Sequence, residues 1–310
     1  MKIYWQSFVD ASASQPYMER LDRYLNAIAA PGNTVHVAGI SPPDRDFGRL
    51  SEFRCAILAV DNGLAAEEAG FDAYVMGHFQ DPGLYALRSA VEIPVVGVGE
   101  ATLHLAAQLG RRIGLVTIDD VFETWHREQA DLYGLGSRIA GVAGMACRPE
   151  DFSGAFAGDE TARRRMLDDF SACAAPLVAA GADVIVPAGV LPGLLLGGER
   201  GFTVGHAPVV NCAAAGLKGA EMWGELRRLD GLGPSRGPSF AKAPARARED
   251  FRRLVREGRG EHPLHHASHG PPPPSATGED SHRAFDPPLR SGGGRERSEP
   301  EGARKRRDAT

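Results

Sequence analysis

The sequence predicts an α/β fold in which two similar lobes, each a parallel sheet with helices, face one another across a cleft. Three observations predict it. Short runs rich in Val and Ile alternate with amphipathic stretches as far as residue 230. One unit of this alternation occurs twice. After residue 230 the composition shifts to Gly, Pro and charged residues, which favours a disordered C-terminal tail.

Short apolar runs give the strands of the predicted sheets. A run of Val and Ile that is continuous, rather than alternating with polar residues, is typical of a parallel strand buried on both faces. Helices between such strands then cover the two faces of each sheet. The predicted strands are Lys2–Ser7, Thr34–Gly39, Ala73–Met76, Pro94–Val98, Arg112–Thr117, Asp183–Pro187 and Pro208–Asn211.

Amphipathic stretches between these runs predict the helices. Gly110 and Gly134 follow two of them and are suited to ending a helix. Asp81 before Pro82 suits a helix start, with the carboxylate as N-cap and the proline in the first turn. The predicted helices are Gln15–Ala29, Asn62–Ala69, Gly83–Val91, Glu100–Leu109, Val121–Tyr133, Glu160–Ala180 and Ala213–Arg228.

The repeated unit relates the two lobes. "AGFDAYVMGHFQDPGL" followed by "IPVVGVGEA" is matched by "AGADVIVPAGVLPGLL" followed by "APVVNCAAA". Counted from Gly70 and Gly181, His78 and Gly189 fall at the same offset. Two pseudosymmetric Rossmann-like lobes predict an active-site cleft between them, because open parallel sheets bind ligands at the C-terminal ends of their strands. The residues predicted at such ends are Ser7, His78, Thr117, Gly189 and Asn211.

The repeat and the change in composition divide the chain. Residues 1–100 form the first α/β lobe, which 208–230 complete, and 101–207 form the second. Residues 231–258 are a C-terminal extension with one short helix in "EDFRRLVREG". Residues 259–310 hold almost no large apolar side chains, so they cannot offset the entropy of ordering.

Composition narrows the class of protein. The formal net charge of -5 and the pI near 6.1 give no attraction to nucleic acid or to an anionic membrane surface. No apolar run approaches the ~20 residues that span a bilayer. The N-terminus lacks the apolar core of a signal peptide, which predicts the cytoplasm. Ala-rich helices such as "AAPLVAAGA" permit a subunit interface, and we expect a homo-oligomer.

No metal or cofactor site is predicted. The four cysteines are far apart and form no CxxC pair. "GVGEA" lacks the G-x-G-x-x-G spacing of a dinucleotide fingerprint, and no P-loop occurs. Histidines cluster in the Pro-rich tail, where mobility argues against a specific metal site. They are His262, His265, His266 and His269.

One long stretch carries a family resemblance. "GFDAYVMGHFQDPGLYALRSAVEIPVVGVGEATLHLAAQLGRRIGLVT", with "GADVIVPAG" and "APVVNCAAAGLKGAEM", resembles the aspartate/glutamate/hydantoin racemase superfamily, in particular its hydantoin racemase branch. The resemblance covers about residues 1–254. It implies two pseudosymmetric α/β lobes around the active site, no cofactor (hence no pyridoxal phosphate), and two cysteines that act as general base and acid.

The resemblance also implies site residues, and it breaks at the two cysteines. Their positions fall at His78 and Gly189, so neither thiol is present. The polar loop after the first strand matches Gln6 and Ser7, and a substrate-contacting threonine matches Thr117. Glu100 matches the glutamate of the family's "GEA" segment, and it also suits the N-terminus of a helix.

The remaining residues suggest which chemistry is possible. With an unperturbed pKa near 6.5, His78 can take or give a proton near neutrality. Asp81 either orients that ring or caps a helix. Gly189 opens space or lets backbone N–H groups approach the substrate. Cys212 is a candidate second acid/base, and Gln6 and Asn211 are candidate substrate contacts.

Three functions fit these residues. The first is a cofactor-independent racemase or isomerase that moves a proton at a carbon alpha to a carbonyl in a small amino-acid derivative or hydantoin-like compound. The second is a lyase, decarboxylase or hydrolase, because one acid/base suits delivery of a proton to one face only. The third is a non-catalytic relative that binds a small molecule.

Overall fold

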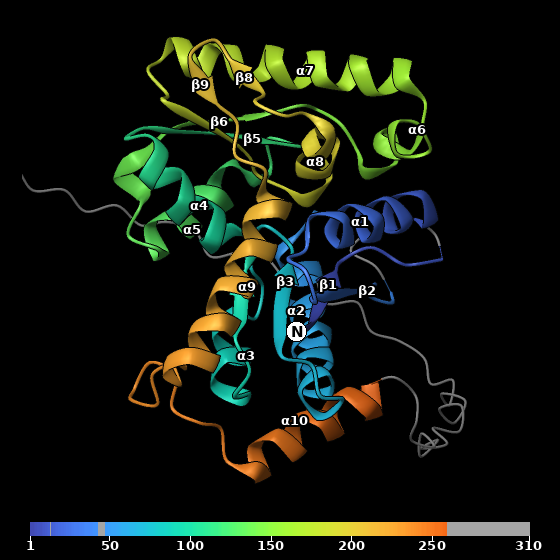
Figure 1. Ribbon diagram of the computed structural model, residues 1–310, viewed down its shortest axis with the longest axis vertical. Coiled ribbons are helices and arrows are strands. Elements are labelled where there is room, and N and C mark those ends of the chain that lie inside the picture. The colour runs from blue at the N-terminus through green and yellow to red at the C-terminus, as the bar shows by residue number, and fades with distance from the viewer. Residues whose placement is uncertain (13, 43–46, 259–310) are drawn as a thin grey trace, which may run out of the picture. The chain divides into compact units, whose positions relative to one another are not determined.

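The fold is built on two parallel sheets, as the continuous apolar runs predict (Figure 1). The computed structural model describes residues 1–12, 14–42 and 47–258. The predicted tail, residues 259–310, lies outside the described residues, and so do its clustered histidines.

The first sheet has the strand order β2-β1-β3-β4, and all its pairs are parallel. Its central strand β3 is buried along its whole length, which explains its unbroken apolar sequence. The register pairs Ser7 with Gly77, so the C-terminal ends of β1 and β3 lie side by side. The strands are β1 (Lys2–Ser7), β2 (Thr34–Ala38), β3 (Ala73–Gly77) and β4 (Val95–Gly97).

The second sheet has the parallel order β6-β5-β7. Strand β6 was not predicted. Its segment "IAGVAG" is an edge strand of mostly half-buried small residues and lacks a Val/Ile run. Pairing of Val116 with Pro187 places the ends of β5 and β7 together. The strands are β5 (Ile113–Thr117), β6 (Ile139–Gly144) and β7 (Val184–Pro187), beside the hairpin β8 (Thr203–Val204) and β9 (Ala207–Pro208).

The predicted strand Pro208–Asn211 is wrong in extent and direction. Only Ala207–Pro208 is a strand, and it pairs antiparallel with β8. Val209 reaches the second sheet through an isolated parallel bridge to Ile185. The run stops there because Asn211 accepts hydrogen bonds from two backbone amides and thereby starts the next helix.

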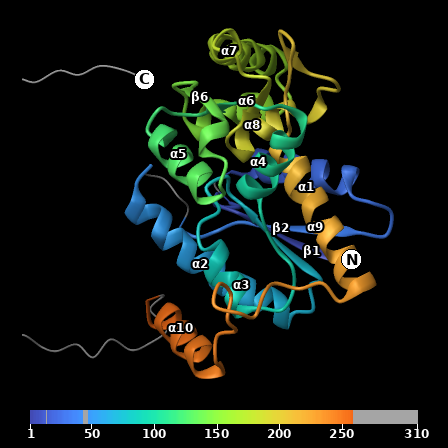
Figure 2. The same ribbon diagram turned by 90° about the vertical axis from the view of Figure 1, so that its left-hand side faces the viewer.

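Helices cover both faces of each sheet. Helices α1 and α9 lie on one face of the first sheet, and α2 and α3 lie on the other (Figure 2). Helix α7 covers one face of the second sheet, and α4 and α5 cover the other (Figure 1). The α-helices are α1 (Gln15–Ile28), α2 (Arg49–Glu68), α3 (Leu84–Ala90), α4 (Val98–Leu109), α5 (Phe122–Leu132), α6 (Ser153–Phe156), α7 (Glu160–Ala179), α8 (Val190–Leu195), α9 (Cys212–Asp230) and α10 (Ala245–Gly258). The 3-10 turns are η1 (Gly136–Arg138), η2 (Pro149–Phe152) and η3 (Leu196–Gly198).

Some helix ends lie where the sequence signals predict them, and others do not. Gly110 caps α4, and Gly134 follows α5 with a left-handed φ of +72°, as predicted. Helix α2 begins at Arg49, well before the predicted Asn62, and no side chain caps its N-terminus, so the sequence gives no start signal there. Helix α3 begins at Leu84 after the left-handed Gly83, so the predicted N-cap role of Asp81 for this helix is wrong.

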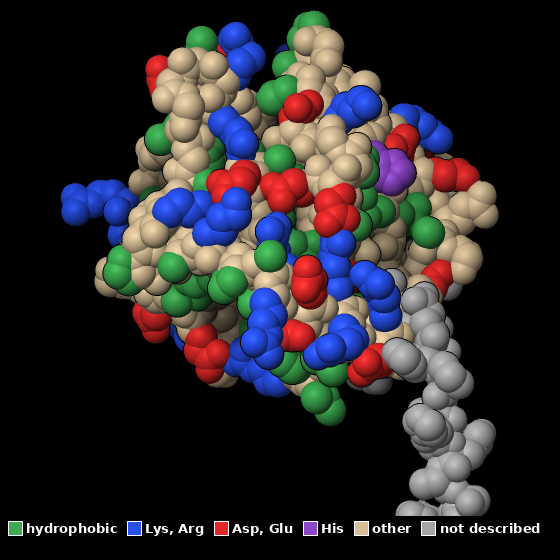
Figure 3. Space-filling view, turned by 90° about the horizontal axis from the view of Figure 1, so that it is seen from below, with side chains coloured by type: hydrophobic (Ala, Val, Ile, Leu, Met, Phe, Trp, Pro, Cys, Tyr) green, Lys and Arg blue, Asp and Glu red, His purple; other side chains and the backbone are tan. Residues whose placement is uncertain are grey.

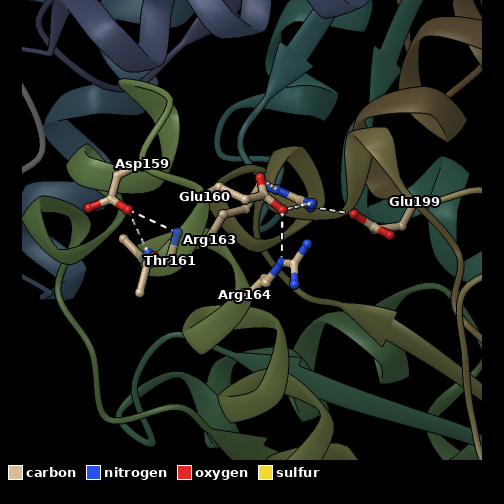
Figure 4. Close-up of polar contacts among 7 residues, drawn as sticks. Asp159, Glu160, Thr161, Arg163, Arg164 and Glu199 are labelled. Carbon is tan, nitrogen blue, oxygen red and sulfur yellow. Dashed lines mark hydrogen bonds and ion pairs between the residues drawn. The ribbon is translucent and has the colours of Figure 1, made fainter.

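Ion pairs fix the beginning of α7 (Figure 4). Asp159 caps the helix by accepting from the amides of Thr161 and the residue after it. Arg163 bonds Glu160 within the helix and reaches Glu199, just beyond η3. These contacts hold the segment that follows α8 against α7.

The C-terminal extension is packed on the first lobe. Helix α10 contacts α2, and its Val255 is buried in the apolar cluster beneath. Arg252 pairs with Glu68, and Arg236 pairs with Glu92. Basic and acidic side chains are interspersed over this side of the molecule (Figure 3).

Candidate active site

A cavity of about 90 Å³ lies at the C-terminal ends of the strands of both sheets. Residues that directly follow β1, β3, β5 and β7 line it, so the two predicted lobes share it. This is where the sequence predicts a cleft. Its volume is well below the ~300 Å³ at which drug-sized ligand sites begin, so the cavity suits a small molecule.

The side chains that line the cavity are polar or apolar but carry no formal charge. Among the described residues no Lys, Arg, Asp or Glu lines it. A free carboxylate would therefore find no Lys or Arg partner among the described lining residues, and leaving a buried charge unpaired is costly. The polar side chains on its walls are those of Ser7, Tyr17, His78, Gln80 and Thr117.

His78 lies on the cavity wall at the end of β3. Its ring packs against Phe8 with centroids 4.6 Å apart. The buried Nδ1 has no hydrogen-bond partner among the described residues. Burial lowers the pKa of His78 to about 4, so the ring is neutral at pH 7. A neutral imidazole has a lone pair with which it can accept a proton.

Thr117 lies on the same cavity at the end of β5 and is backed by a buried histidine. Its Oγ1 is 3.3 Å from His126 Nε2. His126 is fully buried on α5, and its Nδ1 is 3.4 Å from Gln129 Oε1. Burial lowers the pKa of His126 to about 4, which keeps this ring neutral too. Sequence periodicity does not fix the direction of His126, and the structure places it behind Thr117 rather than in the cavity.

Asp81 neither caps α3 nor orients His78. Its carboxylate accepts from the backbone amides of Gly99 and Glu100, at 3.0 and 2.7 Å, and therefore caps α4. The hydroxyl of Tyr133 donates to it at 2.8 Å. Burial raises the pKa of Asp81 to about 7, and these hydrogen bonds act in the opposite direction. Asp81 thus joins the loop of His78 to helices of the second sheet.

The first turn of α4 also holds Glu100, as predicted. Its carboxylate pairs with the guanidinium of the buried Arg88, with Nη1 at 3.0 Å from Oε1. Glu100 does not line the cavity. The residue therefore stabilises the helix end and α3 rather than the site.

Gly189 forms part of the cavity wall at the start of α8. Its φ of 168° is extended backbone that any residue adopts. A Cβ placed there would lie 3.2 Å from Pro192 Cδ, a contact that a small shift of the ring relieves. No side chain acts from this position in the native chain.

Three predicted site residues do not line the cavity. Gln6 is fully buried and its amide is used within the fold, with Nε2 donating to Ser7 O at 2.8 Å and Asn62 donating to Oε1 at 2.7 Å. Asn211 caps α9 and donates to the Tyr24 hydroxyl at 3.0 Å.

The third is Cys212, which lies behind the cavity wall. Its thiol is 3.2 Å from the carbonyl of Gly189 and is fully buried. Burial raises the pKa of Cys212 to about 12, so the thiolate is not populated at neutral pH. None of the four cysteines, which all lie within the described residues, forms a disulfide.

Tyr17 reaches the cavity from α1, although it was not among the predicted site residues. The Ser7 hydroxyl lies 3.4 Å from the Tyr17 hydroxyl. Burial raises the pKa of Tyr17, so the phenol keeps its proton. Only the position of Tyr17 in the first turn of a helix after a strand end could have suggested this role.

The described residues offer neither a metal-binding cluster nor a membrane-spanning helix. No three His, Cys, Asp or Glu side chains of the described ranges are grouped so that they could hold a metal ion. Within the same ranges, every helix is too short or too polar to cross a bilayer.

Comparisons with known proteins identify the family and the fold. The profile of the family described as Asp/Glu/hydantoin racemase matches residues 8–220. A hydantoin racemase from Pseudomonas sp. (strain NS671) is 37% identical over 76 residues, which are 24% of this chain and 30% of that protein. The matched stretch therefore spans about a third of that relative.

Two solved structures share the fold. Allantoin racemase from Klebsiella pneumoniae matches with a TM-score of 0.62 and 25% identity, over 79% of this chain and 94% of its own. Allantoin racemase from Pseudomonas fluorescens matches with a TM-score of 0.62 and 22% identity, over 78% and 97%.

Proposed function

Since the chain belongs to the Asp/Glu/hydantoin racemase family, we propose that it moves a proton at a carbon next to a carbonyl group in a small, uncharged, amide-like compound. The family membership confirms the resemblance to the hydantoin racemase branch, and the parallel α/β fold is also confirmed. The proposal assigns the acid/base role to His78.

One observation carries this proposal: His78 lies on the wall of a small cavity that no charged side chain of the described residues lines. A cyclic amide or ureide brings a polarised carbonyl without a net charge, so it needs no cationic partner. A free amino acid would bring a carboxylate, whose desolvation no Lys or Arg of the described lining residues offsets.

The proposed mechanism begins with proton removal by His78. Its free nitrogen lone pair takes the proton from the carbon, and the electron pair moves onto the carbonyl oxygen. The Tyr17 hydroxyl, which accepts from Ser7, has its own proton to donate to that oxygen. Gly189 offers no acid on the other side, so His78 or a water molecule returns the proton.

Proton exchange tests the proposal. The full chain is incubated with hydantoin and 5-substituted hydantoins in deuterated water, and deuterium at the carbon next to the carbonyl is followed by NMR. We expect exchange that His78→Asn reduces at least ~100-fold, which is typical of loss of an acid/base. The matched control is His104→Asn, which replaces an exposed histidine on α4 and should leave the exchange rate unchanged.

Two outcomes would contradict the proposal. Absence of exchange across the panel would remove the proton-transfer function, and exchange undiminished in His78→Asn would remove the role of that residue. Chiral chromatography separates the reaction types, because irreversible conversion to another product in place of interconverted enantiomers would indicate a lyase or hydrolase.

A further inference from the structure

A buried chain of side chains connects the N-terminus of α4 to the cavity wall. It runs from Asp81 through Gln129 and His126 to Thr117. Exposure of each of the four residues is 7% or less. Because these side chains contact one another directly, the direction of each hydrogen bond follows from the groups at its two ends.

The first link fixes the amide of Gln129. Its Nε2 contacts the backbone carbonyl of Phe79 and lies 3.3 Å from Asp81 Oδ2. A carbonyl oxygen only accepts, so the amide nitrogen must face it. The amide oxygen of Gln129 therefore faces His126.

The second link fixes the tautomer of His126. Gln129 Oε1 is an acceptor, so the proton of the neutral ring lies on Nδ1. Nε2 is then left with a lone pair that faces Thr117 Oγ1. The hydroxyl of Thr117 donates its single proton to this nitrogen and has only lone pairs left for the cavity.

We propose that His126 is a positioning residue that makes Thr117 a hydrogen-bond acceptor toward the cavity, so that the site selects ligands that present an N–H group to this wall. A carbonyl or carboxylate oxygen placed there would meet lone pairs. The inference rests on the proposed function, because it names the face by which the substrate of that same cavity is held.

A matched pair of small ligands tests the selection. 2-Pyrrolidinone and γ-butyrolactone have similar five-membered rings and differ by an N–H in place of a ring oxygen. Dissociation constants for the full chain are measured by ligand-detected NMR titration. We expect the lactam to bind at least ~10-fold more tightly than the lactone, which corresponds to about one hydrogen bond gained and one repulsion avoided.

Three variants assign the selection to the pair of residues. Thr117→Ser keeps the hydroxyl and should keep the lactam preference. Thr117→Val and His126→Phe should each reduce the ratio to about 1. In the Thr117→Val background, His126→Phe should change the ratio no further, because the two residues act through one hydroxyl.

The results that overturn the inference are distinct from those that overturn the proposed function. Equal binding of lactam and lactone by the unaltered chain, or binding of neither up to the solubility limit, overturns the inference. A His126→Phe variant that weakens both ligands equally makes the histidine merely structural. Because these measurements involve no turnover, a lactam preference without proton exchange would remove the proposed function alone.

Discussion

Replacement of the buried Asp81 by alanine is expected to be among the most destabilising changes near the cavity. The carboxylate accepts two backbone amides at the start of α4, although it lies in a loop far earlier in the chain. It is 5% exposed, and its φ of 52° is a left-handed conformation that alanine disfavours. A local exposed cap, Asp159 on α7, provides the comparison.

The magnitude follows from the groups that Asp81→Ala leaves without partners. Each buried amide without an acceptor costs ~1–3 kcal/mol, and there are two, those of Gly99 and Glu100. The left-handed alanine adds ~1 kcal/mol. We therefore expect a loss of about 4 kcal/mol in the free energy of unfolding. Asp159→Ala removes an exposed cap and should cost ~1 kcal/mol.

Urea denaturation at pH 7, followed by circular dichroism, measures both losses. Asp81→Asn is a useful intermediate, because asparagine tolerates the left-handed conformation and keeps one acceptor oxygen. We expect its loss to fall between the other two. If Asp81→Ala costs no more than Asp159→Ala, the carboxylate does not hold the helix in the way described.

Three further predictions concern the site and its surroundings. The site should accommodate the side chain of Gly189→Cys. The new thiol adds an acid on the wall that lacks one, so the rate of enantiomer interconversion should rise relative to the rate of simple proton exchange. An unchanged ratio of the two rates would count against the proposed geometry. The pKa values of His78 and His126 are lowered to about 4, so each histidine contributes up to ~3 kcal/mol of stability that is lost as pH falls from 6.5 to 4, whereas Asp81, whose pKa is raised to about 7, contributes in the opposite direction over this range. Replacing His126 with phenylalanine should flatten that dependence in urea titrations, and an unchanged slope would refute it. Arg236→Ala removes hydrogen bonds to backbone carbonyls at the end of α3 and should lower the free energy of unfolding by ~1–3 kcal/mol in urea titrations. The side chain of Arg246 is 92% exposed, so Arg246→Ala should change that free energy by no more than ~0.5 kcal/mol.

Strands that are buried on both faces could be predicted from the sequence because burial requires an unbroken apolar run. β1 matches its prediction from Lys2 to Ser7, and β5 begins one residue inside its predicted range. β6 and β9 could not be predicted in this way. One is an edge strand of small residues and the other a two-residue hairpin arm, so neither leaves a period in the sequence.

Site residues at strand ends could be predicted from the sequence, whereas those on helices could not. Four site residues lie at the C-terminal ends of strands or within two residues of those ends, so the topology alone brings them to one cavity: Ser7, His78, Thr117 and Gly189. Their chemical roles stay predictions. Residues that act from helices could not be found, because a helix presents side chains all round and tertiary packing decides which one faces the site.

Tyr17 and His126 illustrate this. Both are fully or almost fully buried on helices, and both contact a hydroxyl at a strand end. Gln6 shows the converse error: it precedes the strand end by one residue and therefore points to the opposite side of the sheet, where Asn62 and backbone carbonyls occupy its amide.

The capping of α4 by Asp81 explains the glycines of "GVGEA". A Cβ on Gly97 would lie 2.5 Å from the carboxylate carbon of Asp81, and one on Gly99 would lie 2.0 Å from the backbone carbonyl oxygen of Phe79 in the same loop and 2.9 Å from Asp81 Oδ2. Glycines before a helix often make room for the phosphate of a bound nucleotide. Here they make room for the protein's own anion, so this positive helix end is already neutralised from within.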